Sequence, residues 1–167
     1  QGHRSWGGPP AVYGYKPPST LEAQAAINNE ILTIVMLESP EAISNADEIA
    51  EVDGVDVLFI GTSDLTAELG ISGQMGHPKV IEAYRAVGEA CRKHGKILGM
   101  GGVYDEENAT RYVGMGARFL LTGSDHSYMV TGADQRVNFF NNLPSAPGGA
   151  AEAAPVAVEK KKKKKDK

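Results

Sequence analysis

The sequence is poor in cysteine and has no long apolar run. One cysteine, Cys91, occurs among 167 residues. A single thiol excludes a disulfide framework and fits a reducing compartment, and its place on the apolar face of a helical pattern predicts a core residue. No apolar stretch approaches the roughly 20 residues that a membrane helix needs. The N-terminal residues also lack the apolar segment of a secretory signal, so we expect a cytoplasmic protein without membrane contact.

Positive charge is scarce over most of the chain. Residues 1–143 carry 10 Lys and Arg against 18 Asp and Glu, which argues against nucleic-acid binding by this part. Residues 144–167 are rich in Ala, Pro and Gly and end in lysines, and we expect a disordered tail there. The lysines either keep the terminus solvated, which we favour, or bind nucleic acid, acidic lipid or a receptor. The predicted organisation is one domain, residues 1–143, followed by a tail, residues 144–167.

Strand-like and helix-like patterns alternate along the chain. Apolar runs predict strands at residues 31–38, 55–61, 96–102 and 117–123. The first run is rich in β-branched residues, and it and the second run predict strands that are buried on both faces. A helical pattern follows each run, and this alternation is typical of an α/β fold with a parallel sheet. Four such units form either a small open sheet or half of a (β/α)₈ barrel, for which ~250 residues are typical. The glycines within residues 99–102 lack the context of a phosphate-binding loop and predict close strand packing instead.

The helix boundaries carry local signals. Ser39 followed by Pro40 predicts one helix that runs to about Glu51. Gly95 is well placed to end the helix that reaches His94. The other predicted helix starts are Ser19 or Thr20, Ser63, His77 with Pro78, Asp105, and a position near Ser127.

Two acidic residues follow the first two predicted strands. Glu38 ends one apolar run, and Asp64 comes after the turn at Gly61-Thr62-Ser63. Neighbouring parallel strands lie about 4.8 Å apart, so their carboxyl ends would bring the two carboxylates together. Mg²⁺ prefers oxygen ligands and commonly takes one or two carboxylates, with water and substrate completing its shell. The alternative is that both acids are helix caps or first-turn acids.

The segment around these acids resembles the core signature of the HpcH/HpaI aldolase family. The family pattern is an apolar strand that ends in Glu before a Ser/Thr-x-Glu run, and a second strand that ends in a Gly-Pro/Thr-x-Asp-Leu turn. Residues 38–42 and 54–65 match these two pieces. Further similar stretches are residues 2–8, 76–78 and 119–125. The resemblance implies the C-terminal half of a (β/α)₈ TIM barrel, made of four parallel strand–helix units.

The resemblance also implies a chemistry. Glu38 and Asp64 would hold a divalent metal ion (Mg²⁺, Mn²⁺ or Co²⁺) that chelates pyruvate and stabilises its enolate as a Lewis acid. The backbone N–H groups of Ser63 and Asp64 would bind the pyruvate carboxylate. The expected reaction is the reversible cleavage of a 4-hydroxy-2-oxo acid to pyruvate and an aldehyde.

The sequence departs from the family in one respect. The family's general-base His and pyruvate-binding Arg belong to the first half of the barrel, which we expect to be missing, so no catalytic residue is assigned. Two alternatives follow: an inactive truncated homologue that keeps the metal ligands, or an enzyme like citrate lyase β or malyl-CoA lyase. The compact turn favours an aldolase. We also expect a homo-oligomer, because the strands at Leu32 and Phe119 would leave open sheet edges and full-length relatives exchange their last helix between copies.

The histidines do not obviously supply the missing base. His77 and His94 flank a predicted helix, where capping or a favourable helix-end charge explains them. His126 follows the last predicted strand, on the side of the expected site, and is a weak candidate for substrate contact. His3 and Arg4 lie in the opening loop, and Arg4 is an equally weak candidate.

Overall fold

The computed structural model describes residue 16 and residues 18–144. Within this range the chain divides into two compact units at Gly123 and Ser124, which are described separately. The predicted disordered tail, His3 and Arg4 lie outside the described residues, and the predicted domain boundary after residue 143 stays a prediction. The elements in chain order are α1 (Thr20–Glu30), β1 (Ile34–Leu37), α2 (Pro40–Ser44), α3 (Ala46–Glu51), β2 (Val57–Gly61), α4 (Thr62–Glu68), α5 (Pro78–His94), β3 (Ile97–Gly101), α6 (Glu106–Gly114), β4 (Ala117–Leu120) and α7 (Asp125–Asn141).

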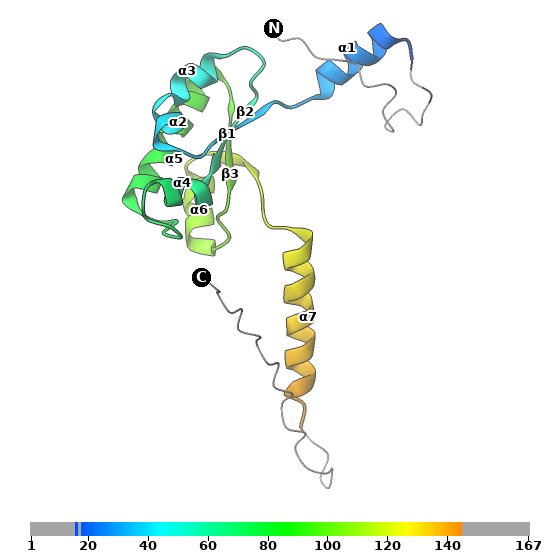
Figure 1. Cartoon of the computed structure of the whole chain (residues 1–167), viewed down its shortest axis with the longest axis vertical. Helices are drawn as coiled ribbons and strands as arrows, with labels where there is room; N and C mark the ends of the chain where they lie inside the picture. Colours follow the sequence, from blue (N-terminus) through cyan, green and yellow to red (C-terminus); the bar gives the residue numbers. More distant parts are fainter. Residues whose placement is uncertain (1–15, 17, 145–167) are drawn as a thin grey trace, which may run out of the picture. The chain divides into compact units, whose positions relative to one another are not determined.

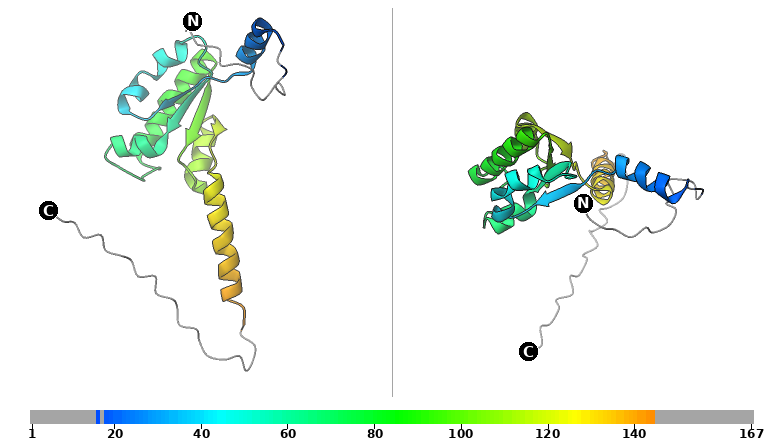
Figure 2. Two further views of the ribbon diagram at one scale, coloured as in Figure 1. Left: turned by 45° about the vertical axis from the view of Figure 1, so that its right-hand side comes forward. Right: turned by 90° about the horizontal axis from the view of Figure 1, so that it is seen from above.

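The strands of the first unit form one parallel sheet in the order β1-β2-β3-β4. Leu37 pairs with Ile60, and Ile60 pairs with Met100, so the carboxyl ends of β1, β2 and β3 reach the same edge. The helices from α2 to α6 lie on one side of the strands (Figure 1). Figure 2 shows this layering from two further directions. The predicted α/β fold of four parallel strand–helix units is confirmed.

The core lies between the sheet and these helices. β2 is buried along its whole length, and α5 turns Val80, Tyr84 and Val87 inward at helical spacing. Cys91 continues this stripe and is 3% exposed. Burial raises the pKa of its thiol to about 11, so the thiol is a packed core group, as the sequence predicted.

Two glycines of β3 give room to an aromatic ring of β2. A Cβ atom would lie 2.6 Å from the Phe59 ring at Gly99 and 2.4 Å from it at Gly101. Phe59 also meets Phe119 of β4 edge to face, with ring centroids 6.1 Å apart. The close strand packing predicted for residues 99–102 is therefore confirmed.

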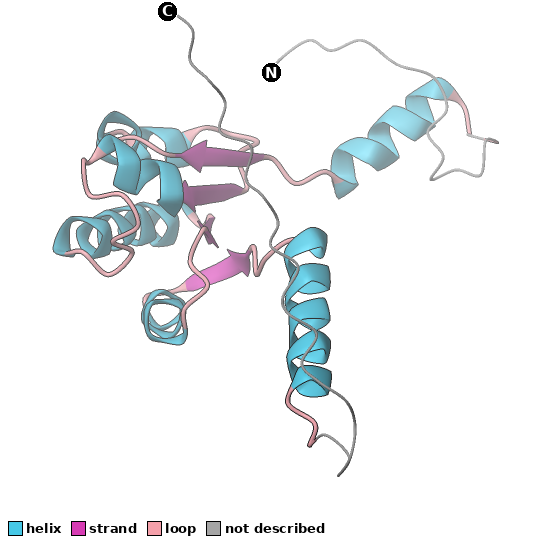
Figure 3. Ribbon diagram, turned by 60° about the horizontal axis from the view of Figure 1, so that its bottom comes forward, coloured by secondary structure: helices cyan, strands magenta, loops and turns pink. Residues whose placement is uncertain are grey.

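The prediction that the first strand is buried on both faces is wrong. Ile34 and Met36 of β1 are 40% and 54% exposed, whereas Leu37 is buried. β1 is an outer strand, and the helices between the strands cover only one side of the sheet (Figure 3). Among the described residues of the first unit, no helix layer covers the opposite face of β1. The predicted open edges are found at β1 and β4.

One predicted helix is divided in two. The chain from Pro40 to Glu51 forms α2 and α3, and Asn45 between them has φ −94° and ψ 10°. The Ser44 hydroxyl donates to the Glu41 carbonyl at 2.8 Å. Short polar side chains compete with the backbone in this way and make poor helix interiors, which explains the break.

Four predicted N-caps are confirmed and one is wrong. Ser19 accepts a hydrogen bond from the Glu22 amide, Ser39 from Ala42, His77 from Lys79 and Asp105 from Asn108. Ser63 caps nothing, because α4 starts one residue earlier with Gly61 as its N-cap. Gly95 ends α5 with φ +66°, a conformation that suits glycine.

The second unit contains α7. Its N-cap is Ser124, so it begins slightly before the predicted start near Ser127. None of its described residues is buried, and Met129, Phe139 and Phe140 are each more than half exposed. Among the described helices of the chain, none combines the length and apolar character needed to cross a membrane.

Candidate functional site

Two carboxylates lie at the carboxyl-terminal edge of the sheet. Glu38 follows β1 directly, and Asp64 is in the first turn of α4, which starts immediately after β2. Because β1 and β2 are parallel neighbours, both acids reach the same edge. They border one cleft with a volume of about 440 Å³. The other lining residues are Met36, Ser39, Ala42, Ala67 and Glu68.

The ionisation of Glu38 reflects this setting. Desolvation raises the pKa of Glu38, and the nearby Asp64 carboxylate raises it further. Ionising both carboxyl groups is therefore opposed by their mutual repulsion. A bound cation would remove this repulsion. The pair therefore fits a hard divalent ion such as Mg²⁺, which accepts two carboxylates and completes its shell with water or substrate oxygens.

Gly61 makes room for the Glu38 side chain. A Cβ atom at Gly61 would lie 2.7 Å from Glu38 Cγ and 2.7 Å from Glu38 Oε1. The Glu38 side chain therefore runs directly over the last residue of β2. Any side chain at position 61 would displace the Glu38 carboxylate from this position.

The start of α4 offers backbone N–H groups beside the acids. No side chain caps this helix, and the first amides of a helix have no acceptor within it. Ser63 and Asp64 are exposed. A Cβ atom at Gly102 would lie 3.0 Å from the Ser63 nitrogen, so glycine there keeps this approach open. The two residues whose amides are predicted to bind a carboxylate are thus exposed.

The alternative prediction, that both acids stabilise the starts of helices, applies to Asp64 and not to Glu38. Ser39, and not Glu38, caps α2 by accepting from the Ala42 amide at 3.2 Å. Glu38 therefore has no capping role. Asp64 does lie in the first turn of α4, where a negative charge favours the helix. Its two possible roles, helix stabilisation and metal binding, are compatible.

The histidines of the described residues have other partners. His77 accepts a hydrogen bond from the Lys79 amide at 3.2 Å. His94 Nε2 lies 3.0 Å from Asp47 Oδ1, and in the second unit His126 Nδ1 lies 3.0 Å from Ser124 Oγ. Nowhere in the described part of the chain do three or more His, Cys, Asp or Glu side chains form a metal-binding group. The carboxylate pair is therefore the candidate site that remains.

Two residues near the site were not recognised in the sequence. Thr62, next to Ser63, is fully buried, and its Oγ1 lies 2.8 Å from the Tyr84 hydroxyl. A hydroxyl in a turn and a tyrosine 22 residues later give no local signal of their pairing.

Comparison with known proteins identifies the family. The family model for HpcH/HpaI aldolase/citrate lyase matches residues 4–131. The chain belongs to this family. It is 34% identical over 135 residues to the 4-hydroxy-4-methyl-2-oxoglutarate aldolase of Hapsidospora irregularis, covering 79% of this chain and 50% of that protein. It is 41% identical over 98 residues to the 5-keto-4-deoxy-D-glucarate aldolase of Enterobacter sp. (strain 638), covering 59% of this chain and 38% of that protein.

A solved structure supports the same assignment. The HpcH/HpaI aldolase of Desulfitobacterium hafniense DCB-2 matches with a TM-score of 0.72 and 33% identity, over 86% of this chain and 55% of that one. The chain thus spans about half the length of these relatives or less. This partial coverage agrees with the predicted half barrel.

Proposed function

We propose that this chain is part of a metal-dependent carbon–carbon lyase. The reaction would be the reversible cleavage of a 4-hydroxy-2-oxo acid to pyruvate and an aldehyde. The observation that carries the proposal is the pair Glu38 and Asp64, which border one cleft beside the uncapped start of α4 and lie close enough for the charge of Asp64 to raise the pKa of Glu38. The relatives reported above are named aldolases, which favours this reaction over that of a citrate lyase.

Each residue has a defined part in this proposal. Glu38 and Asp64 would hold Mg²⁺, Mn²⁺ or Co²⁺. When bound, such an ion supplies Lewis-acid stabilisation of negative charge that develops on a 2-oxo acid. The backbone N–H groups of Ser63 and Asp64 would receive the substrate carboxylate, as amides at a helix start can. Gly102 leaves room beside the Ser63 amide because it has no side chain.

A second candidate function is binding without turnover. It is favoured by the histidine positions, since the described histidines bind elsewhere and none lines the cleft. A general base typically contributes about 10²–10⁴ in rate. A chain without one would keep the metal and the 2-oxo acid but release no product at a useful rate.

Exchange of the pyruvate methyl protons with deuterium separates the two candidates. The 167-residue chain would be incubated with pyruvate and Mg²⁺ or Mn²⁺ in D₂O and followed by NMR. The control is the Glu38→Ala, Asp64→Ala double variant. Metal-dependent exchange that the double variant loses would support the lyase. A folded chain that binds Mn²⁺ but shows no exchange would support binding alone.

The remaining expectations concern partners and location. We propose a pyruvate-like 2-oxo acid and an aldehyde as the small-molecule partners. A homo-oligomer and a cytoplasmic location stay predictions. The uncovered outer strands β1 and β4 are consistent with pairing to another chain.

A further inference from the structure

One buried hydrogen bond anchors the turn that carries the candidate ligand Asp64. Thr62 is the first residue of α4, yet it does not cap its own helix. Its side chain is 0% exposed, and its Oγ1 lies 2.8 Å from the hydroxyl of Tyr84. The next two residues, Ser63 and Asp64, are exposed. The turn thus has a buried anchor directly beside the groups that face the cleft.

Tyr84 is itself held firmly. Its ring stacks on Tyr112 of α6, with centroids 3.7 Å apart and planes 11° from parallel. Both rings are fully buried. Burial raises the pKa of the Tyr84 hydroxyl, so the group stays protonated and available for the bond to Thr62.

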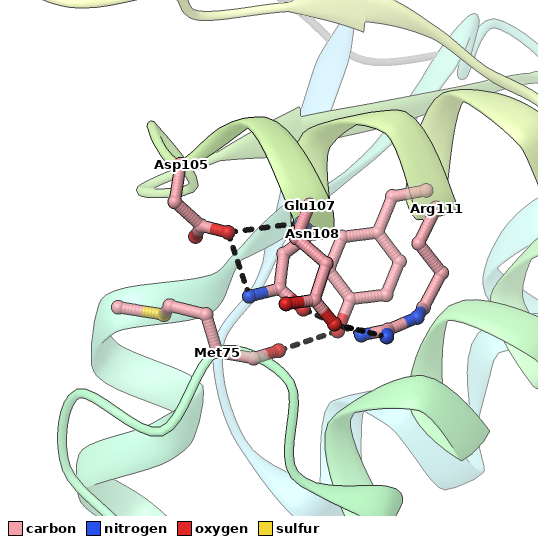
Figure 4. A network of polar contacts seen from close by, with 6 residues as sticks. Met75, Asp105, Glu107, Asn108 and Arg111 are labelled. Atoms are coloured by element: carbon pink, nitrogen blue, oxygen red, sulfur yellow. Dashed lines mark hydrogen bonds and ion pairs between the residues drawn. The ribbon is translucent and has the colours of Figure 1, made fainter.

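The Tyr112 hydroxyl has a separate partner in the loop before α5, because it donates to the Met75 carbonyl. Beside it, Asp105 accepts from the side-chain amide of Asn108 at 2.9 Å, and Arg111 donates to Asn108 and Glu107 at 2.6 and 2.8 Å (Figure 4). The Tyr112 ring therefore supports Tyr84 by stacking, whereas its hydroxyl belongs to a different group of polar contacts.

We propose that Tyr84 is a positioning residue for the candidate site. Its hydroxyl holds Thr62, and through Thr62 it sets the position of the Ser63 and Asp64 amides and of the Asp64 carboxylate. Tyr84 does not touch metal or substrate. The inference rests on the proposed function, because it assigns Tyr84 a role in the site that Glu38 and Asp64 form.

The test compares two matched substitutions in the full chain. Tyr84→Phe keeps the stacked ring and removes the bond to Thr62. Tyr112→Phe is the control, since it also keeps the stack and removes one buried hydroxyl, but this hydroxyl bonds Met75 and not the turn. Mn²⁺ affinity is measured by electron paramagnetic resonance, and stability by urea unfolding.

We expect Tyr84→Phe to weaken Mn²⁺ binding about tenfold, the lower end of the range for residues that support metal ligands. Tyr112→Phe should leave Mn²⁺ binding unchanged even where its loss of stability is similar. Amide hydrogen exchange within residues 62–68 should rise in Tyr84→Phe alone. Combining Tyr84→Phe with Thr62→Val, which removes both polar partners, should add little further loss, because the two residues act as one unit.

Several outcomes would overturn the inference. Unchanged Mn²⁺ affinity in Tyr84→Phe, or an equal loss in Tyr112→Phe, would leave the proposed function standing and reject the positioning role. If the unaltered chain binds Mn²⁺ no better than the Glu38→Gln, Asp64→Asn double variant, the proposed site and the inference fail together. Amide hydrogen exchange needs no metal. It rejects the inference by itself if the amides of residues 62–68 are equally protected in Tyr84→Phe and Tyr112→Phe.

Discussion

The substitution Gly61→Ala should separate metal binding from folding. Gly61 has φ −80°, which alanine adopts without strain, so the backbone accepts the change. The new Cβ atom would lie 2.7 Å from both Cγ and Oε1 of Glu38. This is too close for non-bonded carbon atoms, which approach to about 3.5 Å. The Glu38 side chain must therefore rotate away from Asp64.

The expected effect on stability is small. Replacing glycine by alanine where the backbone allows it stabilises a chain by about 0.4–1 kcal/mol through the unfolded state. Moving Glu38 off its preferred rotamer costs about 0.5–1.5 kcal/mol. The two nearly cancel, so the free energy of unfolding should change by less than about 1 kcal/mol. The metal affinity should change far more. Mutating residues that only support metal ligands lowers metal affinity about 10–100-fold, and Glu38 is itself a proposed ligand. We expect Mn²⁺ binding to weaken about 100-fold.

The assay measures Mn²⁺ binding by electron paramagnetic resonance and unfolding by urea with circular dichroism. Gly114→Ala in α6 is the matched control, because a Cβ atom there meets nothing within 4 Å. It should bind Mn²⁺ like the unaltered chain. The reasoning is refuted if Gly61→Ala folds normally and binds Mn²⁺ as tightly as the control.

Three further predictions follow from the same contacts. Glu38→Gln should stabilise the metal-free chain at neutral pH. The pKa of Glu38 is raised from 4.5 in the folded state, so the contribution of this carboxyl group to stability falls as pH rises through the raised pKa. Urea unfolding across a range of pH checks this. Asp47→Asn should make stability less dependent on pH in the acid range. Hydrogen bonds from Lys93 and His94 lower the pKa of Asp47, so its contribution to stability is present above the unfolded-state pKa and is lost as pH falls through the lowered folded-state pKa. Thermal unfolding at graded pH would show this. Gly101→Ala should destabilise by about 1–3 kcal/mol through overpacking against the Phe59 ring, and urea unfolding with an unchanged midpoint would contradict this.

The sequence predicted the parts of this site that depend on local rules. Parallel neighbours end at the same edge, so an acid after each of two strands was enough to place Glu38 near Asp64. Ser19, His77 and Asp105 were recognised as caps because a cap bonds an amide two or three residues away. The family resemblance then assigned chemistry to the acid pair, which spacing alone left open.

The features that escaped prediction depend on distant residues. The Thr62 hydroxyl reaches Tyr84 across 22 positions, and Gly61 matters because a side chain from another strand lies over it. The burial of the first strand was misjudged for a related reason. An apolar run such as that of β1 looks the same whether its second face is covered or not, since coverage depends on what packs there and not on the run itself.

The uncovered face of β1 has a direct consequence for the site. Met36 borders the cleft that contains Glu38 and Asp64, and it is 54% exposed. Water therefore reaches the two carboxylates from this side, and their repulsion acts through a medium of high effective dielectric constant. A layer packed over Met36 would exclude that water and strengthen both the repulsion between the acids and their attraction for a cation. We therefore expect a longer protein in which that face is covered to raise the pKa of Glu38 further and to bind Mn²⁺ more tightly than this chain does.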